Sequence, residues 1–201
     1  MKHSEQLQDT PEDAISGFLL QLDALKLVNR RTYINAGDRL ENSAEHSWHL
    51  AMACWSMASY FNKDLSIEKL LKLALVHDLG EIDAGDTFLY ADNRSQAHIA
   101  ERKCVSRFAS DPGNFITDLS ELWEDQEAGL SPEAKVLKVV DRLLPFLHNV
   151  ASAGKTWRSQ GIRRSQVVNA HAFIDREYPA LWLWMSKKID EATAVGWLVN
   201  D

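Results

Sequence analysis

The 201-residue sequence has few of the features that build disulfide scaffolds or membrane spans. Its two cysteines, Cys54 and Cys104, each lie within an apolar helical pattern, which excludes a disulfide framework or a zinc knuckle and indicates small core residues. No apolar run approaches the ~20 residues that span a bilayer. The polar start, MKHSEQLQDTPEDAIS, lacks the apolar centre of a signal peptide. We therefore expect a cytoplasmic protein with no membrane contact.

Basic residues are also scarce relative to acidic ones. The chain carries 22 Lys and Arg against 29 Asp and Glu, a formal net charge of -7, with a pI near 5.5. This balance argues against nucleic acid as a partner, because proteins that bind it usually present a basic face. A small anionic substrate remains compatible with the sequence if a metal ion or a single arginine supplies local positive charge.

Strict alternation of apolar and polar residues, typical of strands, is missing as well. Apolar residues instead recur at helical spacing almost everywhere, which predicts an all-α fold. The chain has no internal repeat and no linker long enough to divide it, so we expect a single domain over residues 1–201. It should be a compact bundle of roughly seven to nine helices, with its core at about 18–150 and helices within about 160–196 packed on it.

Capping residues and prolines suggest the helix boundaries. The first helix should run from Pro11 to about Val28, with a core face of Phe18, Leu19, Leu22, Leu25 and Leu27. The segment NRRTYINAGDRLEN should follow as a loop, and 153–161 should be another, exposed loop. Further helices are predicted from Asn42 or Ser43, from Ser66 to His77, and at about 93–110, 115–127, 131–153, 163–177 and 179–194. Pro145 should bend or interrupt the helix at 131–153.

A polar cluster follows an apolar helix in the stretch LALVHDLGEIDAGDTF, residues 73–88. His77 and Asp78 project about 100° apart on a helix, and Glu81 lies one turn beyond them, so all three side chains can line one side of a pocket. An imidazole beside a carboxylate can bind a divalent cation. A hydrogen-bonded core histidine next to a solvated aspartate is the alternative interpretation.

Two other positions add to this cluster. Asp141 interrupts the strongly apolar stretch AKVLKVVDRLLPFL, where an aspartate needs a cationic partner if it is buried. That partner could be a metal or a salt bridge to Lys138, Arg142 or a neighbouring helix, but adjacent residues on one helix face each other poorly, which argues against Arg142. His46 lies in the first turn of the helix that begins within ENSAEHSWH.

The ordered set His46, His77-Asp78 and Asp141 resembles the H...HD...D signature of the HD-domain metal-dependent phosphohydrolase superfamily. The segments ENSAEH, HDLGE, GD and KVVD are similar in content and order to the bacterial 5'-deoxynucleotidases and their eukaryotic HD-domain relatives, over about residues 18–150. The resemblance implies an HD-domain helical bundle. It also implies that these four residues bind one divalent transition metal, which could be Mn, Co, Fe, Ni or Zn.

The same resemblance suggests roles for three more residues. Glu81 matches the family's catalytic acidic residue, which orients or deprotonates the attacking water or protonates the departing ribose oxygen. Asp86 matches the aspartate that binds the sugar hydroxyl, and LKLVNR places Arg30 as the arginine that contacts the substrate phosphate, with Arg31 as the alternative. The deoxynucleotidases carry a tryptophan where this chain has Arg31, which leaves its preference for deoxyribose open.

These features favour a phosphoric monoester hydrolase, a 5'-nucleotidase that releases phosphate from (deoxy)nucleoside 5'-monophosphates by attack of a metal-bound water. The alternatives are an HD phosphohydrolase acting on another phosphate ester or a nucleoside triphosphate, and a non-catalytic metal-binding regulatory module. Only His98 lies between Glu81 and Asp141 as a further histidine, so a two-metal site of the HD phosphodiesterase type is not expected. We expect a supporting or packing role for His49 and surface or packing roles for His98 and His148. The resemblance implies a homodimer, to which LWLWM at 181–185 could contribute if it does not pack in the core.

Overall fold

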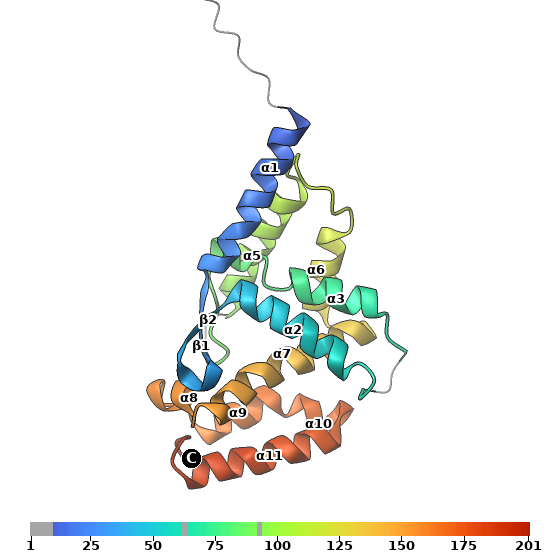
Figure 1. Cartoon of the computed structure of the whole chain (residues 1–201). Coiled ribbons are helices and arrows are strands. Elements are labelled where there is room, and N and C mark those ends of the chain that lie inside the picture. Colours follow the sequence, from blue (N-terminus) through green and yellow to red (C-terminus); the bar gives the residue numbers. More distant parts are fainter. Residues whose placement is uncertain (1–9, 62–63, 92–93) are drawn as a thin grey trace, which may run out of the picture.

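The computed structural model describes residues 10–61, 64–91 and 94–201, and helices dominate it. The 20-residue helix α7 (Pro132–Ala151) runs through the middle of the molecule (Figure 1). Helices α2 (Ser43–Met57) and α3 (Ile67–Val76) pack on one side of it, and α11 (Pro179–Ala194) forms the outer layer on the other side. The helical fold class predicted from the sequence is confirmed.

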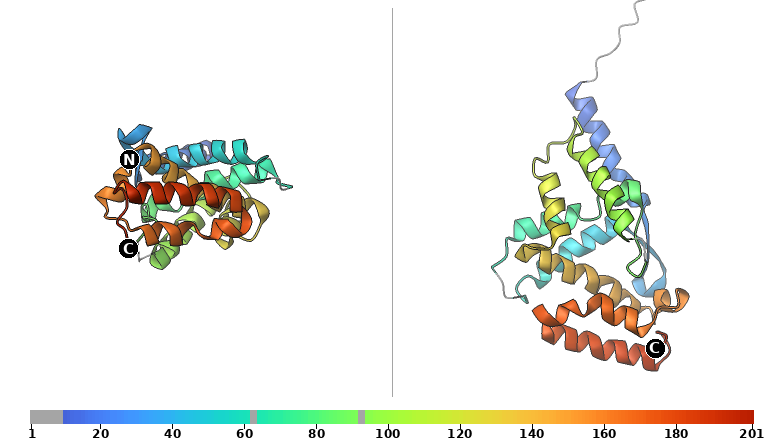
Figure 2. Two further views of the ribbon diagram at one scale, coloured as in Figure 1. Left: turned by 90° about the horizontal axis from the view of Figure 1, so that it is seen from below. Right: turned by 180° about the vertical axis from the view of Figure 1, so that it is seen from behind.

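The other elements lie on both sides of this centre, and Figure 2 shows the arrangement from two further sides. Short 3₁₀ segments cover Asp23–Leu27 and Asn35–Gly37. The remaining elements are α1 (Pro11–Leu22), β1 (Asn29–Ile34), β2 (Arg39–Asn42), α4 (Glu81–Ala84), α5 (Arg94–Ala109), α6 (Leu119–Ala128), α8 (Lys155–Ser159), α9 (Arg164–His171) and α10 (Phe173–Glu177).

Residues 29–42 form a two-stranded antiparallel sheet, and the prediction of a loop for this segment was wrong. The strands pair Asn29 with Asn42 and Ile34 with Arg39, with an irregularity between Asn29 and Tyr33. Strands this short give almost no alternation signal, because only a few residues of each are buried. β2 leads directly into the N-cap of α2 at Asn42, so the hairpin brings its own side chains next to that helix.

The first helix is shorter than predicted. It ends at Leu22 and the chain continues as a 3₁₀ turn, which has three residues per turn instead of 3.6 and therefore rotates the following side chains away from the expected face. Phe18 and Leu25 are buried as predicted, whereas Leu19 and Leu27 are exposed to solvent.

Three further boundary predictions were wrong. The segment at 153–161 contains α8, whose Trp157 is buried, and is not simply an exposed loop. The predicted helix at 163–177 is divided at Ala172 into α9 and α10. Of the two effects predicted for Pro145, an interruption does not occur, because α7 continues across it, and a bend stays a prediction. Helix α6 begins at Leu119, later than predicted, and residue 93, the predicted start of α5, lies outside the described residues.

One cluster of buried apolar side chains extends from α1 to α11. Phe146 of α7 links its parts, because its ring lies 5.6 Å from that of Trp157 and 6.2 Å from that of Trp184. Cys54 and Cys104 are unpaired members of this core, as predicted. Among the described residues, no helix combines the length and the apolar character that crossing a membrane requires.

Gly80 fixes the distance between α4 and α5, and its replacement is expected to destabilise the fold. A Cβ at this position would lie 2.8 Å from the Cα of Glu101, so Gly80→Ala should lower the free energy of unfolding by about 1–3 kcal/mol. The melting temperature should fall by roughly 2–4 °C per kcal/mol. Gly17→Ala is the control: it lies inside α1 with open space around it and should gain about 0.5–1 kcal/mol. Equal melting temperatures for both variants would contradict the argument.

Candidate active site

His46 occupies the fourth position of α2 and is fully buried. Asn42 and Glu45 form a capping box that starts the helix at Ser43 and so sets the position of His46 within its first turn. Its Nε2 lies 3.1 Å from Oδ1 of Asp141 on α7, and its Nδ1 lies 3.3 Å from Oε2 of Glu41 on β2. The imidazole therefore connects the buried carboxylate of Glu41 with the partly buried carboxylate of Asp141, which come from different elements.

His77 and Asp78 follow the last residue of α3, where the helix ends. The Nδ1 of His77 lies 3.1 Å from the carbonyl oxygen of Ala74, to which it donates, so Nε2 is the nitrogen turned toward the carboxylates. Nε2 lies 3.0 Å from Oδ1 of Asp78 and 3.8 Å from Oδ1 of Asp141. The ligand atoms of His46, His77 and Asp78 all lie within 4.8 Å of one another.

Asp141 faces this group from the middle of α7. Its Oδ1 contacts the two histidines, and its Oδ2 accepts a hydrogen bond of 2.8 Å from Arg142. The argument that Arg142 is badly placed for this pairing was wrong, because the long arginine side chain reaches back to its neighbour. The metal and salt-bridge interpretations therefore do not exclude each other: one oxygen of Asp141 is held by Arg142 while the other faces His46 and His77.

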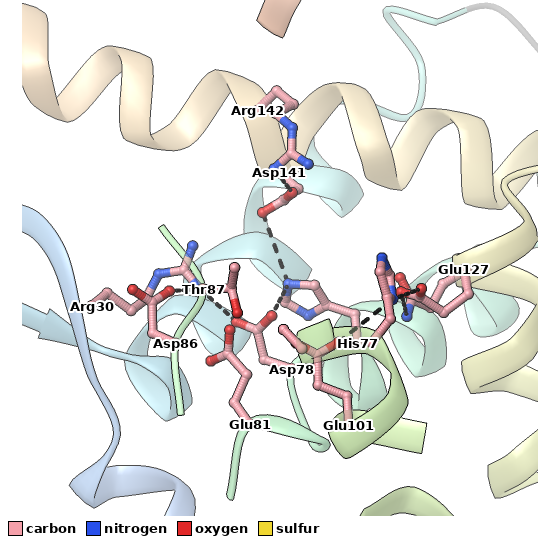
Figure 3. A pocket seen from close by; sticks show the side chains of 13 residues that line it. Arg30, His77, Asp78, Glu81, Asp86, Thr87, Glu101, Glu127, Asp141 and Arg142 are labelled. Atoms are coloured by element: carbon pink, nitrogen blue, oxygen red, sulfur yellow. Dashed lines mark hydrogen bonds and ion pairs between the residues drawn. The ribbon is translucent and has the colours of Figure 1, made fainter. Parts of the chain in front are cut away.

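This donor set suits a divalent transition metal. Two imidazoles and two carboxylates converge, and Nε2 of His77 is buried without a hydrogen bond of good geometry. Although burial opposes ionisation, His77 and Arg30 lower the pKa of Asp78 to about 2, so this carboxylate is charged at neutral pH. His77, Asp78 and Asp141 line a cavity of about 120 Å³, and Figure 3 shows their side chains turned toward one another. His46 lies fully buried next to Asp141.

Glu81 begins the short helix α4 and lines the same cavity. One carboxylate oxygen accepts a hydrogen bond of 2.5 Å from the hydroxyl of Ser43, the first residue of α2. Burial, together with the negative charge of Asp78, raises the pKa of Glu81 to about 9. A carboxyl group with this pKa and a fixed orientation has the properties of a proton carrier.

Arg30 extends from β1 into the cavity and is the only arginine of the Arg30–Arg31 pair that lies against the metal-ligand candidates. Its guanidinium lies 2.6 Å from Oδ2 of Asp78 and 3.9 Å from Oδ1 of Asp86. Arg31 points elsewhere: its guanidinium lies 5.1 Å from the centre of the Phe88 ring and donates to Gln160. Asp86 follows the turn at Gly85, which has a φ of +77°, and burial raises its pKa.

Sequence reasoning gave no role to Glu41 and Ser43, which the structure brings to the candidate site. Glu41 is 1% exposed and contacts His46 and Arg30, while Ser43 contacts Glu81. Both belong to the ENSAEH segment, so their closeness to His46 in the chain was the available signal. His49 and His148 lie beside Glu41, and their ring nitrogens come within 4.8 Å of its carboxylate.

His98, Glu101 and Glu127 form a second group that lines the same cavity, and Figure 3 labels Glu101 and Glu127. His98 pairs with Glu127 across α5 and α6 and is half exposed. This position agrees with the surface role expected for His98.

Comparison with known proteins identifies the family of this chain. The family model for the HD domain matches residues 22–182, and the chain belongs to this family, as the sequence motifs indicated. A solved structure described as a predicted metal-dependent phosphohydrolase, from Magnetospirillum magnetotacticum, is 32% identical, covers 94% of this chain and 98% of that one, and superposes with a TM-score of 0.81.

Curated relatives carry a more specific name. The chain is 32% identical over 138 residues to the 5'-deoxynucleotidase HDDC2 of Danio rerio, a match that covers 65% of this chain and 66% of that protein. A 5'-deoxynucleotidase of Citrobacter koseri is 27% identical over 145 residues, covering 66% and 70% of the two chains. The chain thus spans just under two thirds of the length of the vertebrate relatives.

Proposed function

We propose that this chain is a metal-dependent phosphomonoesterase that hydrolyses nucleoside 5'-monophosphates to nucleoside and phosphate. The observation that carries the proposal is the convergence of His46, His77, Asp78 and Asp141, from three separate helical segments, beside an arginine and a buried glutamate. The names of the curated relatives support the choice of substrate class.

In this proposal the four converging side chains hold one divalent transition ion, which could be Mn, Co, Fe, Ni or Zn. The ion supplies Lewis acidity, which lowers the pKa of water and offsets negative charge on the phosphoryl group. Arg142 keeps one oxygen of Asp141 occupied, so that the other oxygen faces the two histidines.

Three further side chains act on the substrate. Arg30 binds the phosphate oxygens through its planar guanidinium, which is held at the cavity by Asp78 and Glu41. Glu81 transfers a proton, either from the attacking water or to the departing ribose oxygen, while Ser43 fixes its orientation. Asp86, 3.9 Å from Arg30, accepts a hydrogen bond from the sugar hydroxyl.

The proposed reaction is tested with the purified protein loaded with Mn²⁺ or Co²⁺ and a panel of deoxyribo- and ribonucleoside 5'-monophosphates. We expect release of inorganic phosphate from members of both series. Arg31 stands where the deoxynucleotidases carry a tryptophan, and it contacts Phe88 and Gln160, so no bulky ring at this position excludes a ribonucleotide. Nucleoside triphosphates belong in the panel, since Lys138 and Arg142 line an adjoining pocket that could hold a longer phosphate chain. Bound metal without hydrolysis of any phosphate ester would favour the regulatory module instead.

Arg30→Lys is expected to raise KM for a nucleoside monophosphate by about 10- to 100-fold, because lysine cannot grip two phosphate oxygens at once. Arg31→Lys should change KM by less than about threefold, since Arg31 contacts Phe88 and Gln160. Steady-state kinetics of the two variants measure the difference. The reverse order would transfer the phosphate-binding role to Arg31.

We also propose that the chain works as a cytoplasmic homodimer. Trp48, Met52 and Trp55 are exposed at helical spacing on α2, and an apolar groove of about 550 Å³ lies between α2, α7 and α11, with Tyr60 and Trp184 at its edge. Light scattering coupled to gel filtration should give twice the mass of one chain, and Trp55→Glu should return it to the monomer mass. A wild-type monomer at micromolar concentration would contradict this.

A further inference from the structure

Glu41 is a buried carboxylate that lies between His46, one of the metal-ligand candidates, and Arg30, the candidate phosphate ligand. It is 1% exposed, and it lies on β2 immediately before the N-cap of α2. Its Oε2 lies 3.3 Å from Nδ1 of His46 and 3.4 Å from Nε of Arg30, and its Oε1 lies 3.8 Å from Nε2 of His148. A buried carboxylate is costly unless it is paired, so these contacts need a physical explanation.

The two histidines of the site are oriented by different groups. His77 is held at Nδ1 by the backbone carbonyl of Ala74, whereas His46 faces the side chain of Glu41 at the equivalent nitrogen. A carboxylate that accepts the proton of one ring nitrogen fixes the tautomer and leaves the other nitrogen as a donor to a metal. For His46, that other nitrogen is the one 3.1 Å from Asp141.

We infer that Glu41 is a positioning residue that fixes His46 as a metal ligand and Arg30 as a phosphate ligand through the same carboxylate oxygen. Its Oε2 lies 3.3 Å from Nδ1 of His46 without the alignment of a hydrogen bond, and this ionic contact keeps Nε2 turned toward the other ligands. Glu41 also holds Nε of Arg30, so that the terminal nitrogens of the guanidinium face Asp78 and the cavity. The inference rests on the proposed function, because it takes His46 as a ligand to the ion and Arg30 as a ligand to the phosphate.

Because one carboxylate contacts both His46 and Arg30, a substitution of Glu41 should affect metal binding and substrate binding together. Loss of its charge should weaken metal binding through His46 and raise KM through Arg30, while kcat at saturating metal and substrate changes much less. A residue with a merely structural role would lower the melting temperature and leave the metal affinity of the folded protein unchanged. The two measurements therefore separate positioning from structural support.

The test compares Glu41→Gln with Glu45→Gln. Glu45 lies four residues further along and pairs with Arg39 at the surface, and glutamine also suits its capping-box position, so it is the matched control. Metal-free proteins are titrated with Co²⁺ by calorimetry, and the visible spectrum of the bound Co²⁺ is recorded. Glu41→Gln should bind Co²⁺ about 10- to 100-fold more weakly and alter the spectrum, as substitutions of such outer partners do. Glu45→Gln should match the wild type.

Glu41→Asp supports the comparison, because it keeps the charge on a shorter side chain and should bind Co²⁺ with an affinity between those of wild type and Glu41→Gln. If Glu41→Gln does not fold, at least about threefold weaker binding by Glu41→Asp is still expected from the lost contact. Wild-type Co²⁺ affinity in the folded Glu41 variants overturns the inference whether or not the enzyme is active. Tight metal binding by the wild type without release of phosphate from any nucleotide contradicts the proposed function alone.

Discussion

Asp78→Asn is expected to remove both the proposed metal binding and the proposed phosphatase activity. The substitution keeps the shape of the side chain but removes the charge from a carboxylate that lies within 4.8 Å of the ligand atoms of both histidines. It also removes the charge of one of the three carboxylates that pair with Arg30, the one 2.6 Å away. Metal affinity should fall by more than the roughly 100-fold that marks the upper end for outer partners of a metal site. Elemental analysis of the purified protein and phosphate release at a fixed metal concentration measure the two effects.

Asp83→Asn is the matched control for this experiment. Asp83 lies on the neighbouring helix α4, but its side chain is exposed and pairs with Arg107 outside the cavity. The Asp83→Asn protein should therefore keep the metal and the activity of the wild type. The melting temperature of both variants without metal shows whether the fold is intact. If Asp78→Asn retained stoichiometric metal, the assignment of this carboxylate as a ligand would be wrong.

The parts of the site that carry charge in an apolar context could be predicted from the sequence. Asp141 stands among Val139, Val140 and Leu143, and burial of an aspartate there requires a partner whatever the fold. His77 and Asp78 were marked by their place at the end of an apolar helix. The structure brings these residues together with His46, which is what the interpretation as one site required.

The contacts that support these residues could not be predicted, because they join elements that are far apart or too short to leave a pattern. Ser43 reaches Glu81 across 38 positions, and Arg30 reaches Asp78 across 48. Arg30 lies on the β1–β2 hairpin, whose irregular register has no periodic signature in the sequence, and Ser43 follows directly after it. The side-chain length of Arg142 likewise outweighed the general rule that adjacent helical residues do not meet.

Glu81→Gln is expected to separate catalysis from metal binding. A residue that transfers a proton contributes about 10²- to 10⁴-fold to the rate, so kcat should fall within this range. Glutamine keeps the size of the side chain and its contact with Ser43, and the metal content should stay at the wild-type level. Glu68→Gln, at an exposed position on α3, should leave both quantities unchanged. A kcat within threefold of wild type would remove Glu81 from the reaction.

The same variant should be more stable than the wild type when both are free of metal. Burial and Asp78 raise the pKa of Glu81 from 4.5 to about 9, so between these values the folded chain holds a proton that the unfolded chain has released. The stability of the wild type therefore falls as pH rises through this window, whereas a neutral glutamine is not affected. Thermal unfolding should show similar melting temperatures at pH 4.5 and a growing advantage for Glu81→Gln toward pH 9. Higher stability with lower activity in Glu81→Gln is expected if this buried ionisable group serves catalysis at the expense of stability. If Glu81→Gln were less stable than the wild type across this pH range, Glu81 would instead support the fold.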